Sequence, residues 1–270
     1  MFPLAGKAFP TGADELTDSI RDALAEVLTL PKKGVPVTVD APDYPKVKRL
    51  VVNLDGASVS ATEPPPKPEL TGKRQPGLRV KALEVSGRPV RYESSQVEFG
   101  LTAEDVGLAF AKDKSGRPLL VLTDAAAGKV DARVAAADIQ TLALAAASAA
   151  AAQQGIKVQS VDVDLRQEGK RSVVADVRVK AKKMMVSGVV RITARLDVDD
   201  ALTATVSGLN CTGEGVVGSL VAGVVQPKLK AHEGHKVPLV AFSLGDVTLR
   251  DLTIDVKDGL RVAARFGKRG

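Results

Sequence analysis

The sequence has few aromatic residues. Phe, Tyr and Trp together make up 3% of the 270 residues, and Trp is absent. Aromatic side chains usually supply much of the volume of a protein core. Hydrophobic residues nevertheless make up 44% of the chain, enough for one large β-rich domain or two small ones. Because most of them are Ala, Val and Leu, we expect either a tightly packed core of small side chains or an aliphatic surface that binds a ligand.

Cysteine and histidine are also scarce. The single cysteine, Cys211, excludes an internal disulfide and a cysteine-based zinc site. His232 and His235 could supply two metal ligands, but no third ligand stands at a diagnostic spacing. The sequence also lacks a nucleophile elbow, a phosphate-binding loop and a dinucleotide-binding motif. We therefore expect no enzymatic activity, no cofactor and no metal; a metal-dependent hydrolase centred on the two histidines is an alternative hypothesis.

Long hydrophobic runs are missing as well. No stretch reaches the roughly 18 apolar residues of a membrane-spanning helix, and residues 1–10 lack the apolar segment of a signal peptide. We expect the protein to be cytoplasmic or peripheral to a membrane if the chain is full-length, and in the cell envelope if a signal segment was removed. The net charge of +6 suits an anionic membrane surface. Nucleic acid is not expected as a partner, because aromatics interleaved with basic residues are absent.

Three segments are predicted helices. Residues 12–30 and about 214–232 have apolar stripes at helical spacing, and 138–154 has Asp138 as its cap and Gly155 just past its end. The third contains Gly215, Gly218 and Gly223 within its apolar stripe. A glycine inside a helix costs about 1 kcal/mol. Glycines at such positions indicate that another backbone or a ligand approaches the helix closely.

Most of the remaining chain alternates between apolar and polar residues, which predicts strands. Several of these segments are longer than the typical five or six residues. Their connections are too short for crossover helices, so we expect antiparallel pairing. The expected strands are 35–41, 47–54, 55–61, 78–85, 89–100, 105–112, 118–123, 156–166, 171–186, 189–198, 201–209, 245–256 and 259–266.

Two segments interrupt this alternation. Residues 63–77 are rich in proline and predict an exposed loop, with a P-x-x-P sequence at 63–68 that can adopt polyproline II. In the ribbon 177–200 the alternation changes phase at Ser187-Gly188, which indicates a tight turn or a bulge. The ribbon has one apolar face, which we expect to cover either a core or a ligand.

From about residue 133 onward the sequence resembles the LmeA-like phospholipid-binding family of the tubular lipid-binding (TULIP) superfamily. The resemblance rests on the helix "ADIQTLALAAASAAAAQQ" followed by "GIKVQSVDVDLR", the ribbon at 173–200, the helix "GVVGSLVAGVVQPKL" and the closing segment 244–267. Residues 35–60 are similar to the opening of the family. The resemblance implies an α+β fold: a single elongated domain over 1–270, with a long, strongly curved antiparallel sheet wrapped around amphipathic helices and an aliphatic groove for acyl chains.

The function implied by this resemblance is non-enzymatic binding of phospholipid or another long-chain amphiphile, for carriage or sensing at an anionic membrane surface. The alternative is a protein–protein interaction module with a closed core, which offers an edge strand or the proline-rich loop to a partner. Lys182 and Lys183 are the expected contacts to lipid headgroups or the membrane. The residues expected to line the groove are Met184, Met185, Ile192, Leu196, Val216, Leu220, Val221 and Val224.

Overall fold

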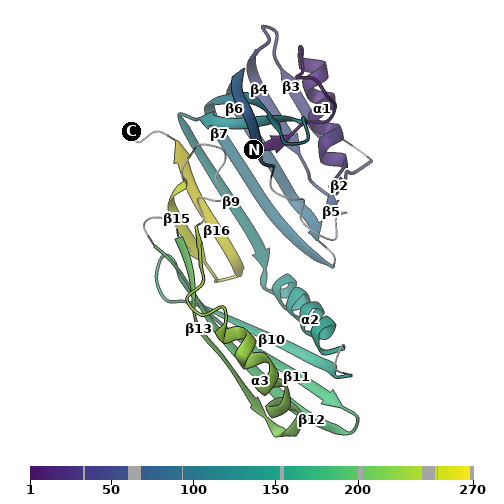
Figure 1. The fold of residues 1–270 in the computed structure, drawn as a ribbon, viewed down its shortest axis with the longest axis vertical. Helices are drawn as coiled ribbons and strands as arrows, with labels where there is room; N and C mark the ends of the chain where they lie inside the picture. Colours follow the sequence, from purple (N-terminus) through teal and green to yellow (C-terminus); the bar gives the residue numbers. More distant parts are fainter. Residues whose placement is uncertain are drawn as a thin grey trace. The chain divides into compact units, whose positions relative to one another are not determined.

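The computed structural model of the protein describes residues 1–32, 34–59, 68–92, 94–152, 155–199, 203–238, 247 and 249–267. The fold is α+β and consists mostly of strands, in two sheets that are not closed into a barrel (Figure 1). The chain divides into two compact units. Unit 1 contains residues 1–132, 242–251 and 263–270, and unit 2 contains residues 133–241 and 252–262. The single elongated domain with TULIP-like curvature stays a prediction.

The three predicted helices are present. They are α1 (Ala13–Ala25), α2 (Ala136–Ala152) and α3 (Gly215–Lys230). The prediction of 12–30 for the first helix was too long at its C-terminal end. Leu28–Thr29 instead form the short strand β2, which pairs with β5 (Ser58–Val59). The pairing of β2 with β5 thus ends the helix, although the helical spacing of apolar residues continues into β2.

The sheet of unit 1 is built around a long hairpin. Its two strands are β6 (Leu70–Tyr92) and β7 (Ser95–Asp113). The strands of this sheet follow the order β15-β16-β9-β7-β6-β4-β3, and β8 also pairs with β7 and β1. Three of them, β9, β15 and β16, belong to unit 1 only in part, and their remaining residues belong to unit 2. The other strands are β1 (Phe2–Pro3), β3 (Val37–Asp40), β4 (Lys46–Asn53), β8 (Pro118–Asp124), β9 (Ala127–Ala135), β15 (Leu249–Asp255) and β16 (Gly259–Gly267).

The expectation of purely antiparallel pairing was wrong in unit 1. Strand β4 runs parallel to β6, from Lys46 opposite Arg79 to Asn53 opposite Ser86. Strand β5 also pairs with β6 in parallel. The connection between β4 and β6 exceeds the dozen or so residues that a parallel pairing needs. It therefore allows the chain to return to the start of the neighbouring strand.

The predicted proline-rich loop is also shorter than 63–77. Residues 60–67, which include most of the P-x-x-P sequence, lie outside the described residues, whereas 70–77 form the beginning of β6. The pairing of β6 with β7 shifts register between Pro76 and Leu78. Proline is tolerated in a sheet at such an interruption of the hydrogen-bond ladder. The strand can therefore begin within the proline-rich segment.

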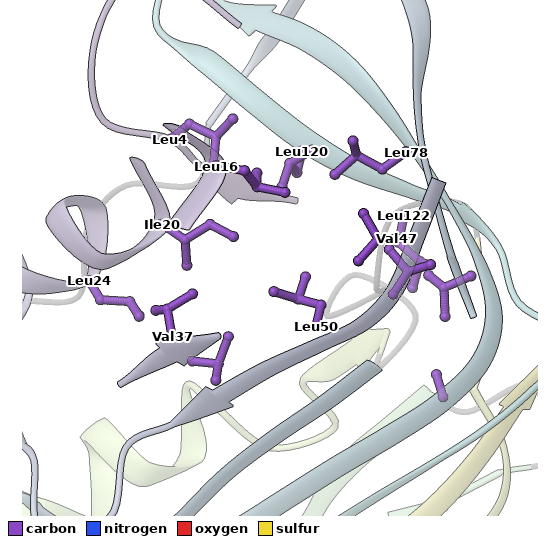
Figure 2. Packing of buried hydrophobic residues seen from close by; sticks show 14 of the residues in the cluster. Leu4, Leu16, Ile20, Leu24, Val37, Val47, Leu50, Leu78, Leu120 and Leu122 are labelled. Carbon is purple, nitrogen blue, oxygen red and sulfur yellow. The ribbon is translucent and has the colours of Figure 1, made fainter. Parts of the chain in front are cut away.

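The core of unit 1 lies between α1 and one face of the sheet. Leu16, Ile20 and Leu24 are buried on the side of α1 that faces the sheet. Figure 2 shows these side chains together with Leu50 and Leu120 from the strands. Leu16, Ile20 and Leu24 are spaced four residues apart and therefore lie on one face of α1. This face is the contribution of the helix to the core.

Unit 2 contains an antiparallel sheet in the order β10-β11-β12-β13-β14. The strands are β10 (Lys157–Gln167), β11 (Ser172–Lys183), β12 (Val186–Val198), β13 (Thr203–Glu214) and β14 (Lys236–Pro238). The turn between β11 and β12 consists of Met184 and Met185, and Lys183 pairs with Val186. The tight turn or bulge predicted at Ser187-Gly188 is wrong, because both residues lie inside β12 and pair with Lys182 and Ala181 without a shift of register.

Glycines bring α3 close to the sheet of unit 2 (Figure 1). A side chain added at Gly218 would overlap the backbone of Val189 in β12, and one added at Gly213 would overlap the backbone of Gly218. The predicted close approach of another backbone is thus confirmed at Gly218. At Gly223, in contrast, an added Cβ would have no neighbour within 4 Å.

Candidate functional site

Unit 1 contains an apolar cavity of about 390 Å³. It lies between the inner face of α1 and the sheet, and residues from β1, β4, β6, β7, β8 and β9 contribute to its wall. Pockets of about 300–1,000 Å³ are typical of small-molecule sites. The lining residues are Met1, Phe2, Ile20, Leu24, Leu50, Val52, Leu54, Leu83, Val85, Phe99, Leu101, Leu108, Leu120, Leu122 and Val130.

Strand alternation builds most of this wall. Leu50 and Val52 are two residues apart on β4, as are Leu120 and Leu122 on β8. Residues at this spacing point to the same face of a sheet. Two of the lining residues are phenylalanine and the rest are aliphatic or Met. Because the lining contains few aromatic rings, its side chains leave part of the space between α1 and the sheet unfilled.

The chemistry of the lining is uniform. Every lining side chain is apolar, so the wall offers no side-chain general acid, base or nucleophile. A polar ligand buried there would lose its hydrogen bonds to water without replacement by side chains, at a cost of roughly 1–3 kcal/mol for each group. The cavity therefore favours a hydrocarbon group.

A second hollow of unit 1 has a mixed lining of charged and apolar side chains and a volume of about 770 Å³. Thr102 lines it from β7, next to Leu101, which lines the apolar cavity. Its charged lining residues are Arg49, Glu84, Glu104, Lys129, Arg250 and Arg265. Arg49 forms an ion pair with Glu84 at 2.9 Å, and both side chains are largely exposed. Leu83 lines both this hollow and the apolar cavity, whereas the Thr102 side chain points to the face of β7 opposite that of Leu101.

The structure places the two methionines of the predicted groove on an exposed turn. The exposed fractions are 86% for Met184 and 92% for Met185. Met184 has a φ of +53°, in the left-handed region that reverses the chain direction. On this turn both side chains lie almost entirely in solvent. The prediction that these methionines line a groove was wrong.

The other predicted groove residues lie in different surroundings. Ile192 and Val221 pack against a small cluster of Val190, Cys211 and Ala222 beneath α3. Leu196 is half-buried on β12. Exposed side chains on α3 account for the remainder: Val216, Leu220 and Val224. The eight residues are not brought together, and none of them lines the apolar cavity of unit 1.

Sequence reasoning missed the cavity because the resemblance was centred on the chain after residue 133. The cavity is formed entirely by residues 1–130. A signal was present in the alternating aliphatic residues of 47–54 and 118–123, which face one helix with an apolar stripe. That signal does not distinguish a filled core from a cavity, because both are lined by Val and Leu.

The two histidines are exposed, and their ring centroids are 6.4 Å apart. Glu233 between them accepts hydrogen bonds from the backbone N–H groups of Gly208 and Leu209, at 2.7 and 2.8 Å. Within the described ranges, no three His, Cys, Asp or Glu side chains form a group that could hold a metal ion. Glu233 therefore supports the connection after α3 in a structural role.

Two groups of unit 2 have a shifted pKa for structural reasons. Hydrogen bonds from the Arg191 guanidinium, whose Nε lies 3.0 Å from both carboxylate oxygens of Asp176, lower the pKa of that carboxyl. Burial raises the pKa of the Cys211 thiol. Neither group faces a described cavity, so both fit structural roles.

Comparisons with known proteins leave the family open. No family model, no curated protein and no solved structure matches the chain. Among the helices in the described part of the chain, none combines the length and the apolar character needed to cross a bilayer.

Proposed function

We propose that unit 1 binds the acyl chain of a phospholipid or another long-chain amphiphile, and that the protein carries or senses this lipid without catalysing a reaction. One observation carries the proposal: the cavity of about 390 Å³ between α1 and the sheet is lined by apolar side chains alone. Seven of these lining residues, among them Ile20, Leu50 and Leu122, are buried, and the others are partly exposed. A hydrocarbon chain can thus contact a buried wall while a polar headgroup stays near solvent.

The energetics favour a chain over a small polar ligand. Each buried CH₂ group contributes about 0.8 kcal/mol. About ten of them contribute about 8 kcal/mol, the free energy of a micromolar dissociation constant before the cost of ordering the chain is subtracted. No lining side chain can select a headgroup. We therefore expect affinity to follow chain length more than headgroup chemistry.

The alternative of an interaction module requires a closed core. The apolar cavity is open to solvent on one side and leaves a gap between α1 and the sheet, which argues against a closed core in unit 1. Engineered cavities of about 150 Å³ with a similar lining remain dry and bind apolar molecules. Occupation by a hydrocarbon chain is therefore the better-supported proposal.

A cavity-filling substitution tests this proposal. Leu101 lines the apolar cavity, whereas the side chain of the neighbouring Thr102 points to the other face of β7 and lines the second hollow. We expect Leu101→Trp to weaken binding of a fluorescent fatty acid by about tenfold or more, because the larger ring occupies the space of several CH₂ groups. Thr102→Trp is the matched control and should bind like the wild type.

The measurement is a titration of each purified variant with the probe, together with native mass spectrometry for co-purified lipid. The chain has no other Trp, so fluorescence also reports whether the new ring is shielded from water. Shielded emission from Leu101→Trp with unchanged probe affinity would contradict binding in the cavity. Probe binding that is undetectable in the wild type would contradict the proposal as a whole.

A further inference from the structure

The turn between β11 and β12 exposes several large apolar side chains in succession. Met184, Met185 and Val186 are all exposed. A single exposed apolar side chain is ordinary, but a group of them indicates an interaction site. Met184 and Met185 project from a two-residue turn, the part of the hairpin farthest along its strands. They are thus accessible to a surface that approaches the end of the hairpin.

The first turns of α3 extend this apolar group. Gly215, at the start of α3, lies beside Ser187: a Cβ added to it would be 3.2 Å from the Ser187 carbonyl oxygen. The helix then presents Val216, which is 70% exposed, and one turn later Leu220, which is 64% exposed. We call Met184, Met185, Val186, Val216 and Leu220 the tip patch. The hairpin and the helix both contribute to it at the same end of unit 2.

Lysines surround the tip patch. Lys182 and Lys183 precede the turn, and Lys157 of β10 stands opposite Lys182 in the sheet. Lys180 lies two residues before Lys182, on the same face of β11. Within the described part of the chain, none of these four lysines forms an ion pair with a carboxylate. The acidic residue Glu214 lies in the same row of the sheet as Lys180, since both stand opposite Val189. Four lysines and one glutamate thus stand around the patch, so its surroundings are predominantly positive.

We propose that the tip patch docks on the surface of an anionic lipid bilayer. The methionine and valine side chains enter the boundary between headgroups and acyl chains, and the lysines contact headgroup phosphates and carboxylates. The positive charge complements the negative surface potential of such a bilayer. Methionine adapts to an irregular fluid surface. A stable protein interface, in contrast, needs about 20–30 residues from each partner, far more than the tip patch offers.

The experiment uses the full chain with two kinds of vesicle, phosphatidylcholine alone and phosphatidylcholine mixed with phosphatidylserine. We expect the wild type to co-sediment with the mixed vesicles, less so as salt screens the lysines. Met184→Asn combined with Met185→Ser should weaken binding by about tenfold or more, in line with the lost apolar area. Asparagine is chosen because it tolerates the φ of +53° at residue 184.

Two further variants separate the contributions. Lys182→Glu combined with Lys183→Glu should remove the preference for phosphatidylserine. Val35→Ser is the matched control, since Val35 is 71% exposed but belongs to unit 1, and it should bind like the wild type. Wild-type protein that fails to bind the mixed vesicles, or a methionine variant that binds them normally, would overturn the docking proposal.

This proposal can fail independently of lipid binding in the cavity. The methionine variant should still bind the fluorescent fatty acid in solution, and Leu101→Trp should still co-sediment with vesicles. Light scattering of the same variants tests another occupant of the patch. If the wild type is an oligomer that the methionine substitutions dissociate, and vesicle binding is unchanged, the patch is an interface between copies of the chain and the membrane proposal is wrong.

Discussion

Single residues of the same type have very different surroundings in this protein. Val216 and Val217 are adjacent in α3, yet the first is exposed and the second is buried against the sheet. Among polar residues, Asp176 is only 4% exposed, and Arg191 binds its carboxylate. Residue type alone predicts neither outcome, because burial depends on the element packed against each side chain.

Asp176 should make the stability of unit 2 dependent on pH. Its folded-state pKa is lowered, so its contribution is present above the unfolded value of about 3.9 and is lost as the pH falls through the folded pKa. We expect Asp176→Asn to lower the free energy of unfolding at pH 7, by an amount that shrinks as the pH falls below about 4. Urea denaturation at several pH values measures this difference.

The control for this substitution is Asp162→Asn. Asp162 is exposed on the neighbouring strand β10, on the same face of the sheet, and its replacement should change stability little at any pH. A deficit in Asp176→Asn that stays constant from pH 7 to the acid range would show that lost packing, not charge, is responsible.

At the scale of elements, glycine positions decide how closely α3 packs on the sheet. Gly218 faces the backbone of Val189, whereas Gly223 in the same helix faces open space. The sequence predicted a close approach from these glycines, and the periodicity predicted the helix itself. It could not say which glycine makes the approach, because that depends on the rotation of the helix about its own axis.

These two glycines form a matched pair for mutagenesis. Gly218→Ala should destabilise unit 2 by about 1–3 kcal/mol, because the new methyl group overlaps the β12 backbone. Gly223→Ala should stabilise it by about 0.5–1 kcal/mol, through the higher helix propensity of alanine. Chemical denaturation followed by circular dichroism measures both. Equal effects of the two substitutions would contradict the close packing of α3 on β12.

At the scale of the whole molecule, the two compact units have different properties. Unit 1 contains the apolar cavity, and unit 2 carries the tip patch. The two proposals thus assign lipid binding and membrane docking to different parts of one chain. Each can be tested without disturbing the other.

Lipid binding by unit 1 should depend on chain length. Each added CH₂ group is worth about 0.8 kcal/mol, which is about a fourfold gain in affinity, until the cavity is full. We therefore expect thermal stabilisation by saturated fatty acids, at a fixed concentration, to rise with chain length and then level off. Differential scanning fluorimetry measures the series. Leu101→Trp should level off at a shorter chain, and stabilisation independent of length would contradict an apolar binding site.

The sequence by itself determined the local elements: three helices, long alternating strands and an α+β fold built from small aliphatic residues. These follow from periodicity, which is a property of neighbouring residues. Only the tertiary structure decided that β4 runs parallel to β6, that two methionines form a turn, and that residues 1–130 line the cavity. The parallel pairing and the cavity depend on contacts between segments far apart in the chain, and the position of the turn depends on the register in which β11 pairs with β12. A leucine in a filled core and a leucine in a cavity wall satisfy the same pattern, and only the packing around them differs.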